Sequence, residues 1–278
     1  METPNFTQEV YTEDRLEELF LKLPAALRVA WREKTDEMDI VDAVKSVEDV
    51  LNRRAIAKEK VFTRIHSIEN TEIQKEVRGV IHEIETTFGN GDYFLGNGSV
   101  AHVYEMPYSK HVCVKYLVHP DMMREHGNNF SDECSYLSDM HRFNVGGIRV
   151  PDVFFDHMSD FGSCFGMEKI DGYSLNIIME GREKTEEIAQ LIRRQDVNDV
   201  VSRMREFIDR MHKEKKIVHR DLSPRNIMVD KNGNWYVIDF GRSRRIEIGD
   251  SSTDMAEETD MASAENAVRE AFKKILTK

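Results

Sequence analysis

Three polar side chains stand at fixed spacing near the C-terminal end of this 278-residue chain. Asp221 follows a histidine and an arginine, Asn226 comes five residues later, and Asp239 opens an Asp-Phe-Gly tripeptide. Carboxylate and amide oxygens are ligands that Mg²⁺ takes in proteins, and a carboxylate can also accept a proton from a reacting hydroxyl. The pattern therefore indicates a metal-binding and proton-accepting site. The alternative is that both aspartates are ordinary turn residues beside a hairpin.

The elements around these residues can also be predicted. Two apolar runs, 227–229 and 235–238, flank a Lys-Asn-Gly-Asn segment, and Asn-Gly between such runs is a strong hairpin signal. The hairpin places the two acidic loops side by side. Residues 196–215 carry an apolar helical face, so a helix is expected to lead into the first loop. His219 is expected to be a hydrogen-bonded structural residue of that loop rather than a general base.

A glycine-rich hairpin followed by a strand lysine is predicted farther upstream. Gly96 and Gly98 form a Gly-x-Gly arrangement followed by Val103, and Lys115 stands in the apolar stretch 111–117. Glycines allow backbone N–H groups to approach phosphates closely. Taken alone, these glycines also fit an ordinary turn, and a strand lysine often only reaches solvent.

A helix over residues 129–143 is expected to carry a glutamate that holds Lys115 in place. Glu133 is the candidate, and Glu125 is the alternative if the helix begins earlier. The structural alternative is that Glu133 is a first-turn acid favoured by the helix dipole. A strand pair at 153–156 and 163–170 is expected to follow.

Together these residues resemble the protein-kinase-like superfamily over residues 89–278, through His-Arg-Asp-x-x-x-x-Asn followed by Asp-Phe-Gly. The resemblance implies an α+β, bilobal kinase-like fold with an N-lobe at about 89–167, a hinge at about 168–172 and a short C-lobe at about 173–278. Residues 1–88 carry repeated apolar stripes, including one from Val61 to Ile84, and are expected to form an all-helical region of three to four helices.

The resemblance assigns a role to each candidate. Asp221 becomes the catalytic base, Lys115 grips the α- and β-phosphates, Glu133 positions Lys115, and Asn226 and Asp239 bind the metal. Met167 takes the gatekeeper place, and the backbone beyond it pairs with the adenine. The expected nucleotide-binding set is Gly96, Asn97, Gly98, Ser99, Val103, Lys115, Met167, Glu168 and Ile170.

The chain also departs from ordinary protein kinases. Only residues 242–278 follow Gly241, there is no Ala-Pro-Glu, and Ser223 stands where serine/threonine kinases carry a lysine. These features resemble compact members: RIO kinases, the small kinase of the KEOPS tRNA-modification complex, lipopolysaccharide-core kinases and short bacterial effector kinases. Residues 246–262 are acidic and rich in serine and threonine, so a flexible loop is expected there, with a helix over 264–276.

The expected function is that of an atypical serine/threonine protein kinase that uses ATP and Mg²⁺, with Mn²⁺ as an alternative metal, and phosphorylates itself. Two alternatives stay open. One is a kinase acting on a small molecule such as a sugar, an aminoglycoside or a lipid headgroup. The other is an ATPase switch or nucleotide-binding scaffold in a complex. A protein partner could bind through residues 9–88.

Composition limits the partners and the compartment. A net charge of −12 argues against nucleic acid or an anionic membrane as the main ligand, because both favour a basic surface. Three cysteines without metal-like spacing favour buried thiols in a reducing compartment. Neither a secretory signal nor a membrane-spanning run is visible. A cytoplasmic protein is expected, and specialised export as an effector stays open.

Overall fold

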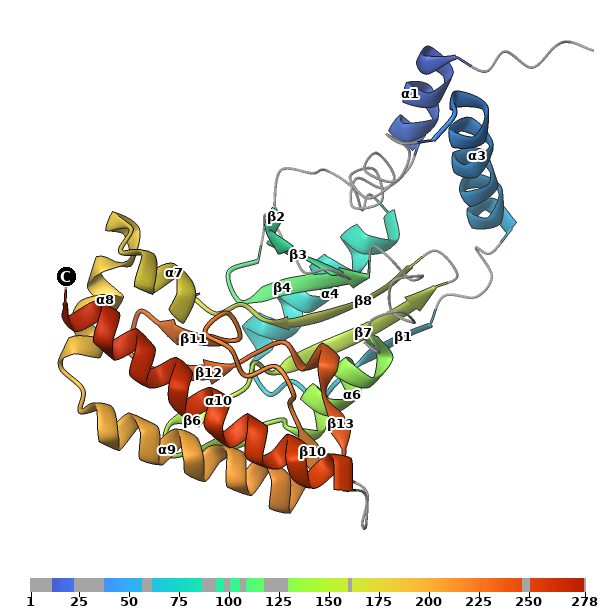
Figure 1. Cartoon of the computed structure of the whole chain (residues 1–278). Helices are drawn as coiled ribbons and strands as arrows, with labels where there is room; N and C mark the ends of the chain where they lie inside the picture. Colours follow the sequence, from blue (N-terminus) through green and yellow to red (C-terminus); the bar gives the residue numbers. More distant parts are fainter. Residues whose placement is uncertain are drawn as a thin grey trace, which may run out of the picture. The chain divides into compact units, whose positions relative to one another are not determined.

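The computed structural model describes residues 12–22, 38–56, 62–86, 94–97, 101–105, 109–117, 130–159, 162–246 and 251–277. The chain divides into two compact units (Figure 1). The first unit comprises Met1–Pro120 and Phe155–Phe165, and the second comprises Asp121–Phe154 and Gly166–Lys278. Among the described helices, none has both the length and the apolar character that crossing a bilayer requires.

The first unit is built on a six-stranded sheet with the strand order β1-β7-β8-β4-β3-β2. Its strands are β1 (Phe62–Ile65), β2 (Phe94–Asn97), β3 (Ala101–Glu105), β4 (Val112–Leu117), β7 (Val153–Ser159) and β8 (Gly162–Glu168). The predicted glycine hairpin is present as the antiparallel pair β2–β3, and β3 pairs antiparallel with β4. Val112 and Val114 of β4 are fully buried, so this strand lies in the core of the unit.

Three helices of the described residues precede the glycine hairpin: α1 (Glu13–Lys22), α3 (Ile40–Ile56) and α4 (Thr71–Thr86). Helix α1 packs against α3, with Leu19 and Phe20 buried on one side and Val44 and Val47 on the other. Helix α4 packs against β4. The helical prediction for this region holds at these places, while residues 1–11, 23–37, 57–61 and 87–88 of the predicted region lie outside the described residues.

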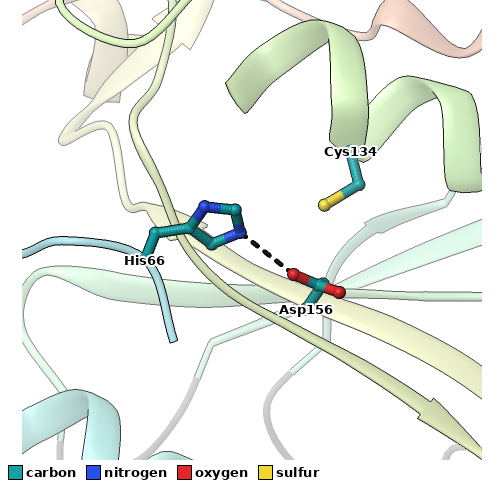
Figure 2. Close-up of side chains that lie close together, drawn as sticks. All are labelled: His66, Cys134 and Asp156. Atoms are coloured by element: carbon teal, nitrogen blue, oxygen red, sulfur yellow. Dashed lines mark hydrogen bonds and ion pairs between the residues drawn. The ribbon is translucent and has the colours of Figure 1, made fainter. Parts of the chain in front are cut away.

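One part of the predicted helical stripe is wrong, because residues 62–65 form strand β1 instead. The Phe-Thr-Arg-Ile segment pairs antiparallel with β7, from Phe62 opposite Met158 to Ile65 opposite Phe155. Aromatic and β-branched residues suit a strand, and a partner strand was available at the sheet edge. A polar cluster reinforces this pairing, since Asp156 accepts from Arg64 Nε at 2.8 Å and binds His66 Nε2 at 3.0 Å (Figure 2). Cys134 in the same figure lies on α6 of the second unit.

The second unit contains a five-stranded sheet with the order β5-β6-β12-β11-β9, and a two-stranded sheet β10-β13. The strands are β5 (Asn144–Val145), β6 (Ile148–Arg149), β9 (Gly172–Ser174), β10 (Ile217–Val218), β11 (Ile227–Asp230), β12 (Trp235–Val237) and β13 (Arg244–Arg245). The predicted Asn-Gly hairpin is confirmed as β11–β12, with Gly233 at φ 82° in the turn.

The helices of the second unit are α6 (Phe130–Asp139), α7 (Leu175–Glu180), η3 (Glu183–Thr185), α8 (Glu186–Arg193), α9 (Val197–Arg210), the π-helical η4 (Met211–Lys215), η5 (Phe240–Arg242) and α10 (Ser251–Leu276). Asp196 caps α9 by accepting from the N–H groups of Asn198 and Asp199, as its position in the sequence favours. Helices α9 and α10 lie side by side (Figure 1) and bury a common apolar core.

The expected flexible loop over 246–262 is wrong where the structure describes it, because helix α10 already begins at Ser251. Ala264, Val268 and Ala271 anchor its C-terminal part in the core, as predicted. Its N-terminal part has few large apolar residues and is anchored by a polar side chain instead. Asp260, 1% exposed, makes three hydrogen bonds inside the unit.

Candidate active site

His219 links the two acidic loops of the second unit. Its Nε2 lies 3.0 Å from the carbonyl oxygen of Ile238, and its Nδ1 lies 3.3 Å from the backbone nitrogen of Asp221. Because a carbonyl accepts and a backbone N–H donates, the ring must carry its proton on Nε2. The ring also packs edge-on against Phe240, with the centroids 4.6 Å apart. Burial lowers the pKa of His219, so the imidazole is neutral and structural, as the sequence predicts.

Asn226 is tied to the loop that carries Asp221. Its Nδ2 donates to the carbonyl oxygen of Asp221 at 2.8 Å, and its own carbonyl accepts from the N–H of Ile238 at 2.9 Å. A carbonyl can only accept, so the amide nitrogen of Asn226 faces the Asp221 carbonyl and the amide oxygen points away from it. No described residue donates a hydrogen bond to that oxygen. Asn226 can therefore offer a hard oxygen ligand next to Asp221.

Asp239 and Glu133 converge beside Gly241. A methyl group placed on Gly241 would lie 3.4 Å from both Asp239 Oδ1 and Glu133 Oε2. Asp239 adopts the left-handed backbone conformation, with φ 64° and ψ 71°, which an aspartate tolerates at some cost. Glu133 is 3% exposed and projects from the first turn of α6, where the sequence predicts it. Its pairing with Lys115, which belongs to the other unit, stays a prediction.

Asp260 fixes the backbone just before Asp221, and the sequence analysis did not predict this role. Its Oδ2 accepts from the N–H of His219 at 2.6 Å and lies 3.2 Å from His212 Nε2, while its Oδ1 accepts from the N–H of Arg220 at 2.7 Å. Arg220 has φ 67°, so these bonds hold a residue in a left-handed conformation that most side chains avoid. No spacing rule pointed to Asp260, because it lies far along the chain in a segment whose composition favours a loop.

The residues predicted to form the hinge begin at Glu168, the last residue of β8, and are fixed by local contacts. Glu168 donates its N–H to the carbonyl of Asp152 at 2.8 Å, and its carboxylate forms an ion pair with Arg149. Burial raises the pKa of Glu168, and Arg149 opposes that rise. The N–H of Glu168 is therefore already engaged.

The hinge is also tied to the β11–β12 hairpin. The carbonyl of Ile170 accepts from the N–H of Gly172 at 2.9 Å, so the N–H of Ile170 is the group that could donate to a base. The N–H of Lys231 donates to the carbonyl of Asp171 at 3.0 Å. Met167 precedes this segment and is half-buried. The adenine contacts expected at Glu168 and Ile170 stay predictions.

Three predicted residues of the first unit stand in register on neighbouring strands. Gly96 of β2 lies opposite Val103 of β3, and Val103 lies opposite Lys115 of β4. The β2–β3 register shifts between Phe94 and Gly96. Asn97 ends β2, opposite His102. The predicted residues Gly98 and Ser99, and the alternative Glu125, lie outside the described residues.

Comparison with known proteins decides the family. A family model described as the protein kinase domain matches residues 83–267, which is more than half of the chain. The chain belongs to the protein kinase family. This match confirms the α+β kinase fold predicted from the sequence, and it makes the chain a member of a family of phosphotransferases.

A curated relative supports the same conclusion. The chain is similar to "Probable serine/threonine-protein kinase mkcF" of Dictyostelium discoideum, with 24% identity over 222 residues. The similarity covers 75% of this chain and 28% of the relative, so the kinase spans under a third of that protein's length.

Membership in the protein kinase family implies ATP and a divalent metal ion in general. The donor groups of this kinase fit such an ion: Asp239 offers a carboxylate, and Asn226 offers an amide oxygen turned away from its hydrogen-bonded nitrogen. Mg²⁺ keeps several waters and is bound by one or two protein side chains together with phosphates, so a set of two is sufficient. The bound ion would neutralise charge on the transferred phosphoryl group.

Proposed function

We propose that this protein kinase is a serine/threonine kinase that uses ATP and Mg²⁺ and phosphorylates itself as well as a protein acceptor. Mn²⁺ is the alternative metal. Asp221 accepts the proton of the attacking hydroxyl, Asn226 and Asp239 bind the metal, and Lys115 holds the α- and β-phosphates with Glu133 positioning it. The glycine hairpin covers the nucleotide, and the backbone of Glu168 and Ile170 pairs with adenine. The proposal includes a cytoplasmic location.

The observation that carries this proposal is the coupling of the two acidic loops in the second unit. His219 bridges them through Ile238 and Asp221, and Asn226 binds both the Asp221 carbonyl and the Ile238 N–H. A proton acceptor and two oxygen ligands are therefore held by one hydrogen-bonded network. Ordinary turn aspartates need no such network, so the network supports the proposal over the turn alternative.

The test compares the wild-type chain with Asp221→Asn and Asp239→Ala in γ-labelled ATP and Mg²⁺, following label on protein and free phosphate separately. General base catalysis typically contributes about 10²–10⁴-fold, so Asp221→Asn should lose at least about 100-fold in rate. It should still bind nucleotide, whereas Asp239→Ala should lose Mg²⁺-dependent ATP binding. Asp199→Asn, an exposed aspartate of α9, is the matched control and should keep full activity.

The labelled product separates the alternatives. Phosphoserine or phosphothreonine on the wild-type protein, identified by mass spectrometry, supports the proposal. Free phosphate without protein label would indicate an ATPase switch or a small-molecule acceptor instead. Full phosphoryl transfer by Asp221→Asn would refute the role of Asp221.

A further inference from the structure

Four arginines lie in the two segments that carry Asp221 and follow Asp239. Arg220 and Arg225 belong to the same loop, and Arg242 and Arg244 belong to the segment that follows Asp239. All four side chains are exposed. We call them the loop arginines.

The pairing of β10 with β13 brings the two segments together. Val218 lies opposite Arg244, and Ser243 Oγ donates to the carbonyl of His219 at 3.4 Å. The segment 242–244 therefore runs alongside 218–220. Arg220 is fixed by the bond between its N–H and Asp260 Oδ1. The pairing therefore brings the segment of Arg242 and Arg244 beside the segment that leads into Arg220, Asp221 and Arg225.

The loop arginines carry charge that the protein does not neutralise. Among the described residues, no carboxylate forms an ion pair with any of the four. Other arginines of the same unit are paired with Asp or Glu; these are Arg149, Arg182, Arg193, Arg203, Arg205, Arg210, Arg245 and Arg269.

This local charge is opposite to that of the whole molecule, whose net charge is −12. A basic surface beside the phosphoryl acceptor raises the local concentration of anionic ligands and repels cationic ones. Arginine also binds carboxylates and phosphates through two parallel hydrogen bonds. An acidic chain would weaken its binding to acidic substrates unless such a surface offset the repulsion.

We infer that the loop arginines select acceptor segments in which negatively charged residues flank the serine or threonine. This inference rests on the proposed function, because it names the substrate class of the same site. Carboxylates and phosphorylated side chains share the required chemistry. Basic acceptor segments are disfavoured by the same charges.

The test measures binding and phosphorylation of four serine peptides that differ only in their flanking residues: aspartate, phosphoserine, alanine or lysine. Binding to the full-length chain is followed by fluorescence anisotropy, and kcat and KM are measured with ATP and Mg²⁺. We expect one of the two anionic peptides to exceed the alanine peptide about ten-fold in kcat/KM, mainly through KM. Raising the salt concentration should reduce this preference, because salt screens exposed charges.

Charge reversal identifies the residues responsible. The double variant Arg225→Glu/Arg244→Glu should lose the anionic preference and bind the lysine peptide better than the aspartate peptide. Arg194→Glu is the matched control, because Arg194 is an exposed arginine at the end of α8. The neighbouring Arg193 donates to the carbonyl of Ile275 near the C-terminal end of α10, whereas Asp260 accepts from the N–H of Arg220 in the loop of Asp221. Asp260 and Ile275 are separated by 15 residues of helix α10, or roughly 22 Å. The control substitution is therefore far from the bond between Asp260 and Arg220.

The outcomes separate this inference from the proposed function. Equal binding of all peptides, or an anionic preference that survives in the double variant, would overturn the inference. So would tighter binding of a single-stranded RNA oligonucleotide than of either anionic peptide at the same salt concentration. If no peptide is phosphorylated and the chain takes no label, the proposed function fails, and the binding data alone decide whether the loop arginines recognise acidic segments.

Discussion

At the scale of single residues, the buried His219 is expected to make the stability of the second unit depend on pH. Its imidazole is fully buried between Ile238, Asp221 and Phe240, and burial lowers its pKa below the ordinary value of 6.5. The nearby carboxylates of Asp260, Asp239 and Asp221 oppose this shift without cancelling it. Protonation in the folded state would add a proton to Nδ1, which would then face the N–H of Asp221, and two donors repel each other.

The sign of the pH effect follows from this lowered pKa. Below about pH 6.5 the unfolded chain takes up a proton at His219 and the native protein does not, so the free energy of unfolding falls by up to about 1.4 kcal/mol per pH unit. The effect should fade over roughly one pH unit above that value, where the unfolded histidine is neutral as well. Urea unfolding at pH 7.5 and pH 5.5, followed by Trp235 fluorescence in a Trp31→Phe background, measures it. His219→Gln should show a smaller loss on acidification, and an unchanged loss would contradict the assignment.

Asp260 gives a second prediction at this scale. Its two oxygens accept from two different backbone N–H groups, so Asp260→Asn must turn an NH₂ group toward one of them. An unsatisfied buried donor costs about 1–3 kcal/mol, and the left-handed Arg220 loses support. We expect lower stability in urea unfolding and a fall in kcat that exceeds any rise in KM for ATP. Glu258→Gln, an exposed carboxylate on the same helix α10, makes the same chemical change and should alter neither.

At the scale of elements, the approach of β9 to β11 depends on one glycine. A Cβ on Gly172 would lie 2.2 Å from the carbonyl oxygen of Val229 and 2.6 Å from the Cα of Asp230. Both are backbone atoms, so the strands must separate to admit a methyl group. Gly172→Ala should therefore lower stability by about 1–3 kcal/mol and raise KM for ATP, because the proposed hinge ends at this glycine.

A glycine on α4 supplies the matched control for that substitution. Gly79 has no atom within 4 Å of the position of a new Cβ. Gly79→Ala should increase stability by about 0.5–1 kcal/mol, because alanine loses less backbone entropy in a helix. Thermal unfolding of both variants measures the difference. Equal and small effects would mean that the β9–β11 approach tolerates a side chain.

Elements with their own local signal could be predicted from the sequence, and elements with a distant partner could not. The β11–β12 hairpin has its Asn-Gly turn, and α9 has its apolar face and its Asp196 cap. By contrast, residues 251–262 contain few large apolar residues, and the helix there is held by Asp260. Apolar periodicity cannot detect a polar anchor. The Phe62–Ile65 segment is too short for its apolar pattern to distinguish a helix from a strand. Its pairing with β7 makes it a strand.

At the scale of the whole molecule, the site could be predicted where function requires fixed residue types at fixed spacing. Within each unit the structure groups the predicted residues: Gly96, Val103 and Lys115 in register in the first, and Asp221 with Asn226 and Glu133 with Asp239 in the second. Asp260 and the unpaired charge of the loop arginines could not be predicted, because both depend on which backbone segments the fold brings together.

Strand β1 also constrains the order in which the protein can fold. His66 binds Asp156 across a sequence separation of 90 residues. The paired residues of β1 and β7 are similarly distant in the sequence, from Phe62 with Met158 to Ile65 with Phe155. Pairing of this kind has a high contact order, because a long loop must close before its contacts stabilise the fold. During synthesis from the N-terminus, β1 leaves the ribosome long before β7 exists. Strand β1 therefore cannot join the sheet before β7 exists, whereas β2, β3 and β4 can already pair. Until then the backbone groups of β1 are hydrogen-bonded to water.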